Sequence, residues 1–208
     1  MRANSVSFEP VKTTSERILD AAEDIFAAKG YSATSLGDVA DVVGIRSPSL
    51  YNHFKSKQAL YEAVLDRLIV NFSTPLQELV QTALTYEQIS VWLENIVRQH
   101  HANPNLARLL QHAALSGGPH TSELIDRLFR PMFLAPDSVE GRDIPFMAQS
   151  GLQPWAVMAF NNLVMSYVTM APMYRDLLGQ DPLGEPALEN QLKLIQMLLR
   201  AVFEYQGD

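Results

Sequence analysis

The chain has 208 residues, of which 47% are hydrophobic and 19% are charged. This composition is typical of a globular protein and excludes a disordered or fibrous one. Cysteine is absent, which excludes disulfides and thiolate chemistry. The N-terminus lacks the apolar run of a signal peptide, so we expect a cytoplasmic protein.

The net charge of −7 is distributed unevenly along the chain. Residues 1–60 contain seven basic and seven acidic side chains, whereas the remainder contains nine basic and sixteen acidic ones. The acidity therefore belongs to the C-terminal part. A balanced N-terminal part can bind DNA if its basic groups share one face, but the overall charge gives no positive support for this.

Apolar residues recur with the period of an α-helix, and the alternation typical of a half-buried strand is missing. We therefore predict an all-α fold. The first helix opens with a capping box, in which Thr13 and Glu16 satisfy each other's backbone donors. It ends at Gly30, because glycine adopts a left-handed C-cap at little cost. A second, short helix runs from Ser35 to Gly44.

The third helix begins with Ser47 as N-cap and Pro48 at the first helical position, where the missing N–H is harmless. A fourth starts at Ser56 and continues towards Pro75. Proline, glycine or capping residues bound the later predicted helices, at about 76–84, 87–102, 104–115, 121–132, 153–176 and 185–205. The stretch 133–152 is predicted to be an ordered loop.

Two short helices joined by a turn at Gly44, and braced by a longer first helix, have the layout of a helix-turn-helix. The second helix of such a pair must expose its N-terminal side chains to the major groove while its apolar side packs on the bundle. The outward-facing candidates are Arg46, Ser47, Ser49, Tyr51, Asn52 and His53. Lys55 and Lys57 follow, where a cation beside backbone N–H groups suits phosphate binding.

The same region resembles the signature of TetR-type repressors over about residues 14–62. The resemblance rests on Gly30-Tyr31-Ser32-Ala33-Thr34-Ser35, Val39-Ala40, Val43-Gly44-Ile45 and the run from Ser47 to Leu60, with its Leu-Tyr-x-His-Phe-x-x-Lys core. It implies phosphate contacts by Tyr51 and Lys57, with His53 as a nearby phosphate or supporting contact. It also implies base-edge contacts by Ser47, Pro48, Ser49 and Asn52, and a backbone contact by Ser35.

Gly37 departs from the family pattern, because some members carry a basic, base-reading residue at this position. Arg46 is a candidate substitute, since arginine can grip guanine bidentately. A solvated or phosphate-bound Arg46 is the alternative.

We expect a flexible arm at 1–12, a helix-turn-helix DNA-binding domain at 13–56, a connecting helix at 57–74 and a helical effector-binding and dimerisation domain at 75–208. The last helix carries a wide apolar stripe, formed by Leu188, Leu192, Ile195, Leu198, Leu199 and Val202. Two long helices from each of two chains can form a four-helix interface. The resemblance implies the same homodimer, which would engage both half-sites of a palindromic operator.

The C-terminal part also has features of a small-molecule pocket. Methionines cluster there with aromatic residues, which suits an adaptable apolar pocket but is also typical of an ordinary core. The candidate effector-binding residues are Trp92, His100, His112, Phe146, Met158, Asn162 and Ser166. Asn162 and Ser166 lie four residues apart on the same predicted helix, and they could either hydrogen-bond a ligand or face solvent. We expect a small, largely apolar effector.

Other classes of function find less support. An uncharged run of 31 residues between Asp143 and Arg175 is long enough to span a membrane, but polar residues interrupt it and no basic cluster flanks it. His100 and His101 are adjacent and point different ways on a helix, so we expect no metal. No set of residues indicates catalysis or a cofactor, so we expect neither.

The sequence thus favours a DNA-binding repressor that an effector releases. The alternative is a regulator of the same fold that activates transcription or responds to a protein partner. A hydrolase or lyase using the histidines is the third class, and it lacks a recognisable catalytic set.

Overall fold

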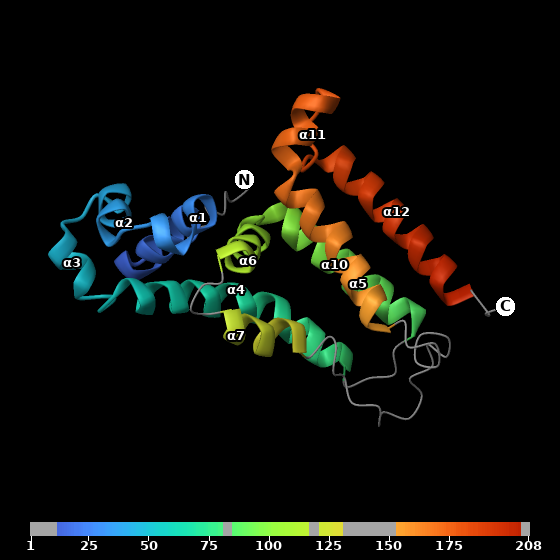
Figure 1. Cartoon of the computed structure of the whole chain (residues 1–208), viewed down its shortest axis with the longest axis horizontal. Coiled ribbons are helices and arrows are strands. Elements are labelled where there is room, and N and C mark those ends of the chain that lie inside the picture. The colour runs from blue at the N-terminus through green and yellow to red at the C-terminus, as the bar shows by residue number, and fades with distance from the viewer. Residues whose placement is uncertain (1–11, 81–84, 117–120, 131–152, 205–208) are drawn as a thin grey trace, which may run out of the picture. The chain divides into compact units, whose positions relative to one another are not determined.

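The computed structural model describes residues 12–80, 85–116, 121–130 and 153–204. All regular elements in these ranges are helices, as Figure 1 shows, which confirms the predicted all-α fold. The chain divides into two compact units, Met1–Val64 (unit 1) and Leu65–Asp208 (unit 2). The predicted loop at 133–152 lies outside the described residues.

Unit 1 is a small helical bundle around an apolar core. It contains α1 (Thr14–Ala33), α2 (Leu36–Val43), α3 (Ser47–Tyr51) and the beginning of α4 (Lys57–Val80). Helix α2 packs against both α1 and α3. The largest fully buried side chains of this core are those of Ile18, Phe26, Val39, Leu50, Leu60 and Val64.

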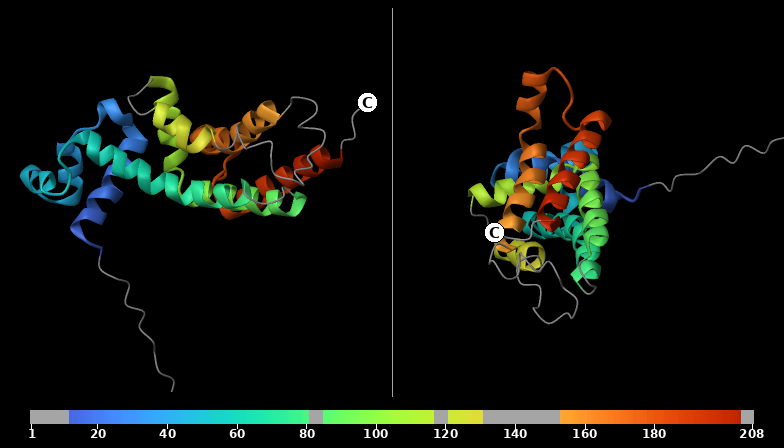
Figure 2. Two further views of the ribbon diagram at one scale, coloured as in Figure 1. Left: turned by 90° about the horizontal axis from the view of Figure 1, so that it is seen from below. Right: turned by 90° about the vertical axis from the view of Figure 1, so that its right-hand side faces the viewer.

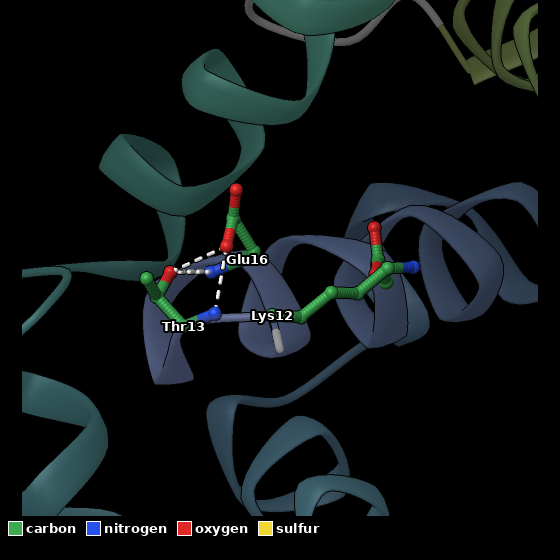
Figure 3. Close-up of polar contacts among 4 residues, drawn as sticks. Lys12, Thr13 and Glu16 are labelled. Carbon is green, nitrogen blue, oxygen red and sulfur yellow. Dashed lines mark hydrogen bonds and ion pairs between the residues drawn. The ribbon is translucent and has the colours of Figure 1, made fainter. Parts of the chain in front are cut away.

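The predicted capping box fixes the first turn of α1, as Figure 3 shows. The backbone N–H of Glu16 donates to Thr13 Oγ1 at 3.2 Å, and the backbone N–H of Thr13 donates to Glu16 Oε2 at 2.7 Å. The hydroxyl of Thr13 also donates to Glu16 Oε2, at 2.8 Å. The two bonds that the Glu16 carboxylate accepts, first from the backbone N–H and then from the hydroxyl of Thr13, hold the pKa of Glu16 below its usual value. Lys12 Nζ lies 2.9 Å from Asp20 Oδ2 in an exposed ion pair.

Two boundaries in unit 1 differ from the prediction. Gly30 has φ 78° and ψ 169°, so it interrupts α1 as expected, but one further turn follows to Ala33. Helix α3 begins one residue early, with Arg46 as an N-cap that makes no side-chain capping bond. Pro48 still occupies the first turn, where no intrahelical donor is lost.

The prediction that Pro75 separates two helices is wrong, because α4 is continuous from Lys57 to Val80. Proline removes one backbone donor and can kink a helix, but the helix can continue on both sides of it.

Unit 2 contains the remaining helices. They are α5 (Tyr86–Ala102), α6 (Asn105–Ser116), α7 (Thr121–Leu124), the π-helix η1 (Ile125–Phe129), α10 (Gln153–Thr169), α11 (Ala171–Leu178) and α12 (Glu185–Glu204). Helix α5 contacts α6, α10 and α12, an arrangement that can be followed in Figures 1 and 2. The core of unit 2 includes Leu93, Val97, Leu106, Leu109, Val168 and Ile195.

The single helix predicted at 153–176 is two helices, α10 and α11, which meet at Met170 (φ −90°, ψ 0°). If α10 continued, the ring of Pro172 would clash with the carbonyl of Val168 four residues earlier. The chain therefore starts a new helix with Pro172 in its first turn. Among the described helices, none combines the length and the apolar character that crossing a membrane requires.

A polar junction joins α5, α10 and α12. Nε2 of His101 lies 2.6 Å from Gln191 Oε1, and Nδ1 lies 3.3 Å from the carbonyl oxygen of Leu183. The buried Gln191 in turn donates from Nε2 to the carbonyl of Leu163 at 3.2 Å. Tyr167 stacks on the His101 ring, with centroids 5.8 Å apart. Buried polar groups thus find partners across three helices, which fixes their register.

Candidate nucleic-acid interface and ligand cavity

Local hydrogen bonds position the α2–turn–α3 segment. The backbone N–H of Ser35 donates to Asp38 Oδ2 at 2.8 Å, and the backbone N–H of Asp38 donates to Ser35 Oγ at 3.1 Å. Hydrogen bonding to the Asp38 carboxylate, first from the backbone N–H and then from the side chain of Ser35, holds the pKa of Asp38 below its usual value. At the other end of α2, Arg17 Nη2 donates to the carbonyl of Val43 at 2.6 Å. Helix α1 therefore contributes a side chain to the end of α2, where Gly44 begins the turn.

The side chains predicted to contact DNA are exposed along this segment. Those of Ser35, Arg46, Ser47, Pro48, Ser49, Tyr51, Asn52 and His53 all face solvent. Leu50, in the middle of α3, is fully buried. Helix α3 is therefore anchored by an apolar side chain and presents polar ones. We refer to these eight exposed residues together with Lys57 as the α2–α3 surface.

Lys57 differs from the others because it is half-buried and held in place. Its Nζ lies 4.4 Å from the centroid of the Tyr31 ring and donates to the carbonyl of Ser32 at 3.3 Å. Tyr31 packs edge-on against Tyr61, which packs in the same way against Phe26, each pair with centroids 4.9 Å apart. Burial raises the pKa of Tyr61 to about 12, with a smaller contribution from Tyr31. A neutral aromatic cluster thus positions the ammonium group of Lys57.

A cavity of about 60 Å³ lies within unit 2 between α5, α6, η1 and α10. It is lined by Trp92, Ile96, His100, Leu106, Leu110, Leu128, Phe129, Phe160, Asn161, Val164 and Met165. No charged side chain lines it within the described part of the chain. The cavity therefore suits an apolar ligand with few polar groups.

His100 is the buried histidine of this cavity, with 5% of its surface exposed. Its Nδ1 lies 2.9 Å from the carbonyl oxygen of Ile96, and because a carbonyl only accepts, Nδ1 carries the proton. Burial lowers the pKa of His100, and the neighbouring His101 lowers it further, although the bond to Ile96 acts in the opposite direction. The ring is therefore neutral near pH 7.

Comparison with known proteins identifies a family for the N-terminal part of the chain. Residues 18–64 match the family model for bacterial regulatory proteins of the tetR family. Residues 18–64 of the chain thus belong to the tetR family of bacterial regulatory proteins. The resemblance seen in the sequence is thereby confirmed.

The curated relatives match mainly the N-terminal part of this chain. It is 36% identical to the HTH-type transcriptional activator FasR of Mycolicibacterium smegmatis over 72 residues, which are 35% of this chain and 33% of FasR. It is 46% identical to the HTH-type transcriptional repressor ComR of Escherichia coli over 55 residues, 26% of each chain. The matched region thus spans a third or less of these relatives.

A solved structure extends the likeness of fold to nearly the whole chain. The fatty acid degradation regulator FadR from Bacillus halodurans superposes with a TM-score of 0.65, covering 96% of this chain and 100% of FadR. The two sequences are 14% identical, so the match shows a shared fold only.

In unit 2, the cavity is lined by two of the predicted effector-binding residues, Trp92 and His100. Three others, Met158, Asn162 and Ser166, are exposed on α10 and do not line it. His112 is half-buried and is also absent from the lining, and Phe146 lies outside the described residues.

The α10 residues that do line the cavity are Phe160, Asn161, Val164 and Met165. They form one stripe at helical spacing, whereas Met158, Asn162 and Ser166 form another on the same helix. Because α10 is apolar nearly all round, the sequence could not indicate which stripe faces the cavity. Packing against α5 and α6 decides it.

Gly37, the departure from the family pattern, is not imposed by packing. A Cβ at this position would meet Ser35 Oγ at 3.5 Å, an ordinary contact. The absence of a side chain there thus leaves an open position at the start of α2.

The neutral state of His100 predicts a pH dependence of stability. Unfolding returns the pKa of His100 to its ordinary value of 6.5, so below that pH the unfolded chain binds more protons than the folded one. The free energy of unfolding must then rise with pH through this range and be lost on acidification. We expect His100→Gln to flatten the rise between about pH 5 and pH 7, measured by urea unfolding at each pH. An equally steep rise in the variant would contradict the neutral assignment.

Proposed function

We propose that this TetR-family protein binds operator DNA through the α2–α3 surface and releases it when a small, largely apolar effector occupies the cavity of unit 2. The observation that carries the proposal is the exposure of polar side chains on α3 and directly beside it, next to a turn and a capped α2. They are those of Arg46, Ser47, Ser49, Tyr51, Asn52 and His53. A helix presented in this way can enter the major groove. An effector acts by binding more tightly to one state of the protein than to the other.

On this proposal the residues of the α2–α3 surface have two roles. Base edges are contacted by Arg46, Ser47, Pro48, Ser49 and Asn52. The DNA backbone is contacted by Ser35, Tyr51, His53 and Lys57. Backbone contacts set affinity and position, whereas base contacts set specificity. The fixed position of Lys57 above Tyr31 supports a phosphate contact, because an immobilised ammonium loses less conformational freedom on binding.

The role of Lys57 predicts a change in salt dependence. Lys57→Ala should weaken binding to specific and non-specific DNA nearly equally and reduce the slope of log affinity against log salt by about one. Fluorescence anisotropy with DNA from upstream of the protein's own coding region measures both the affinity and its dependence on salt. Arg98→Ala is the matched control, because it removes a positive charge from an exposed ion pair on α5. Equal slopes for Lys57→Ala and the wild type would exclude the phosphate contact, and failure of the wild type to bind would exclude the proposed function.

The direction of regulation differs among relatives, since FasR is named an activator and ComR a repressor. We favour repression, in which DNA binding alone blocks transcription and effector binding ends it. An activator is the second candidate. A reporter fused to the bound DNA distinguishes them, because deleting a repressor raises expression and deleting an activator lowers it.

We further propose a homodimer, with an interface that keeps Leu198 and Val202 but not the other end of the predicted stripe on α12. Leu188, Leu192 and Ile195 are buried within the single chain, so these side chains already pack inside unit 2 and are not available to a second chain. Among the exposed apolar side chains, those on other parts of α10 and α12 include Met158, Leu163, Leu194, Met197, Leu198 and Val202. An exposed apolar set of this size is typical of a protein–protein interface.

If this interface forms the dimer, a charge placed in it should dissociate the two chains. Leu194→Asp combined with Leu198→Asp should convert the dimer to monomers, because each carboxylate would lose its hydration without gaining a partner. Light scattering at micromolar concentration measures the change. Leu115→Asp is the control, since Leu115 is 82% exposed on α6 and lies outside the proposed interface. A monomeric wild type, or a double variant that stays dimeric, would refute the proposed interface.

A further inference from the structure

We propose that the ligand of the unit 2 cavity is an uncharged molecule with a hydrogen-bond acceptor oxygen, which accepts from the indole N–H of Trp92. This inference rests on the proposed effector role of the cavity and specifies the chemistry of the ligand. It concerns the group of the ligand that enters the cavity.

The first observation is a buried donor without an acceptor. Trp92 lines the cavity, and its Nε1 is buried with no hydrogen-bond partner among the described residues. The indole ring is held beside Phe160, with centroids 6.4 Å apart and planes inclined by 37°. A buried N–H that has lost its water without gaining an acceptor costs free energy. An acceptor oxygen supplied by a ligand would remove that cost.

The second observation is the absence of a charge that could balance an ionic ligand. No Asp, Glu, Lys or Arg is found among the described lining residues. His100 is neutral, with its Nδ1 proton donated to Ile96. A carboxylate or ammonium entering this cavity would be desolvated without a counter-charge, which strongly disfavours binding. The group that enters is therefore uncharged.

The third observation concerns selectivity among uncharged groups. Asn161 also lines the cavity, but its amide both donates and accepts and so does not discriminate. The indole N–H only donates. A ketone, ester or ether oxygen therefore fits, whereas a hydrocarbon leaves Trp92 without an acceptor. The volume of about 60 Å³ limits the entering group to a few heavy atoms.

The test uses three small probes of nearly equal shape: cyclopentanone, cyclopentane and cyclopentylammonium. The chain has two tryptophans, so its ¹H–¹⁵N spectrum contains two indole signals. We expect saturable binding of cyclopentanone that moves the Trp92 indole proton downfield. Cyclopentane should bind without the downfield shift, and cyclopentylammonium should not bind.

Trp92→Phe keeps an aromatic ring and removes the N–H. It should weaken cyclopentanone binding about tenfold while leaving cyclopentane binding nearly unchanged. Trp155→Phe is the matched control, because Trp155 is 65% exposed and lies outside the cavity lining. This control also assigns the two indole signals and should leave binding of both probes unchanged.

The proposal is overturned if cyclopentanone leaves the Trp92 signal in place, if the ammonium probe binds as well as the ketone, or if Trp92→Phe binds all probes as the wild type does. It is also overturned if no probe binds. DNA binding by the same samples is measured separately, so loss of the proposed ligand chemistry would be distinguished from failure of the proposed regulatory function.

Discussion

The α2–α3 surface depends on the backbone conformation of Gly44. This residue has φ 75° and ψ 34°, and its N–H bonds back into α2. A Cβ at Gly44 would meet no atom within 4 Å, so space does not require glycine there. The left-handed backbone does, because it strains other residues. The hydrogen bond from Arg17 to Val43 then fixes the end of α2 from which the turn departs. Exposure of the polar side of α3 follows from these two constraints.

Features that depend on neighbouring residues could be predicted from the sequence. The capping boxes of α1 and α2 join residues three apart, and a residue type is enough to specify such a contact. The left-handed cap at Gly44 follows from the same kind of local chemistry. Proline was less decisive, because its effect depends on the rest of the helix. Pro75 lies within one continuous helix, whereas Pro172 begins a new one.

Features that depend on packing could not be predicted. Asn161 and Asn162 are adjacent and chemically identical, yet Asn161 lines the cavity and Asn162 is exposed. Only the rotation of α10 against its neighbours distinguishes them. The position of Lys57 above Tyr31 similarly requires two residues that lie 26 positions apart to meet in the folded bundle. Hydrophobic periodicity predicts which helices have buried faces, but a helix such as α10, which is apolar nearly all round, gives no unique face.

The central claim is that the α2–α3 surface is the part of the chain that meets DNA. Amide hydrogen–deuterium exchange of the full chain, with and without a DNA fragment that it binds, tests this claim most directly. The account predicts slower exchange in α2, the turn at Gly44 and α3 when DNA is present. Slower exchange confined to unit 2, with unchanged exchange between Ser35 and Lys57, would contradict it.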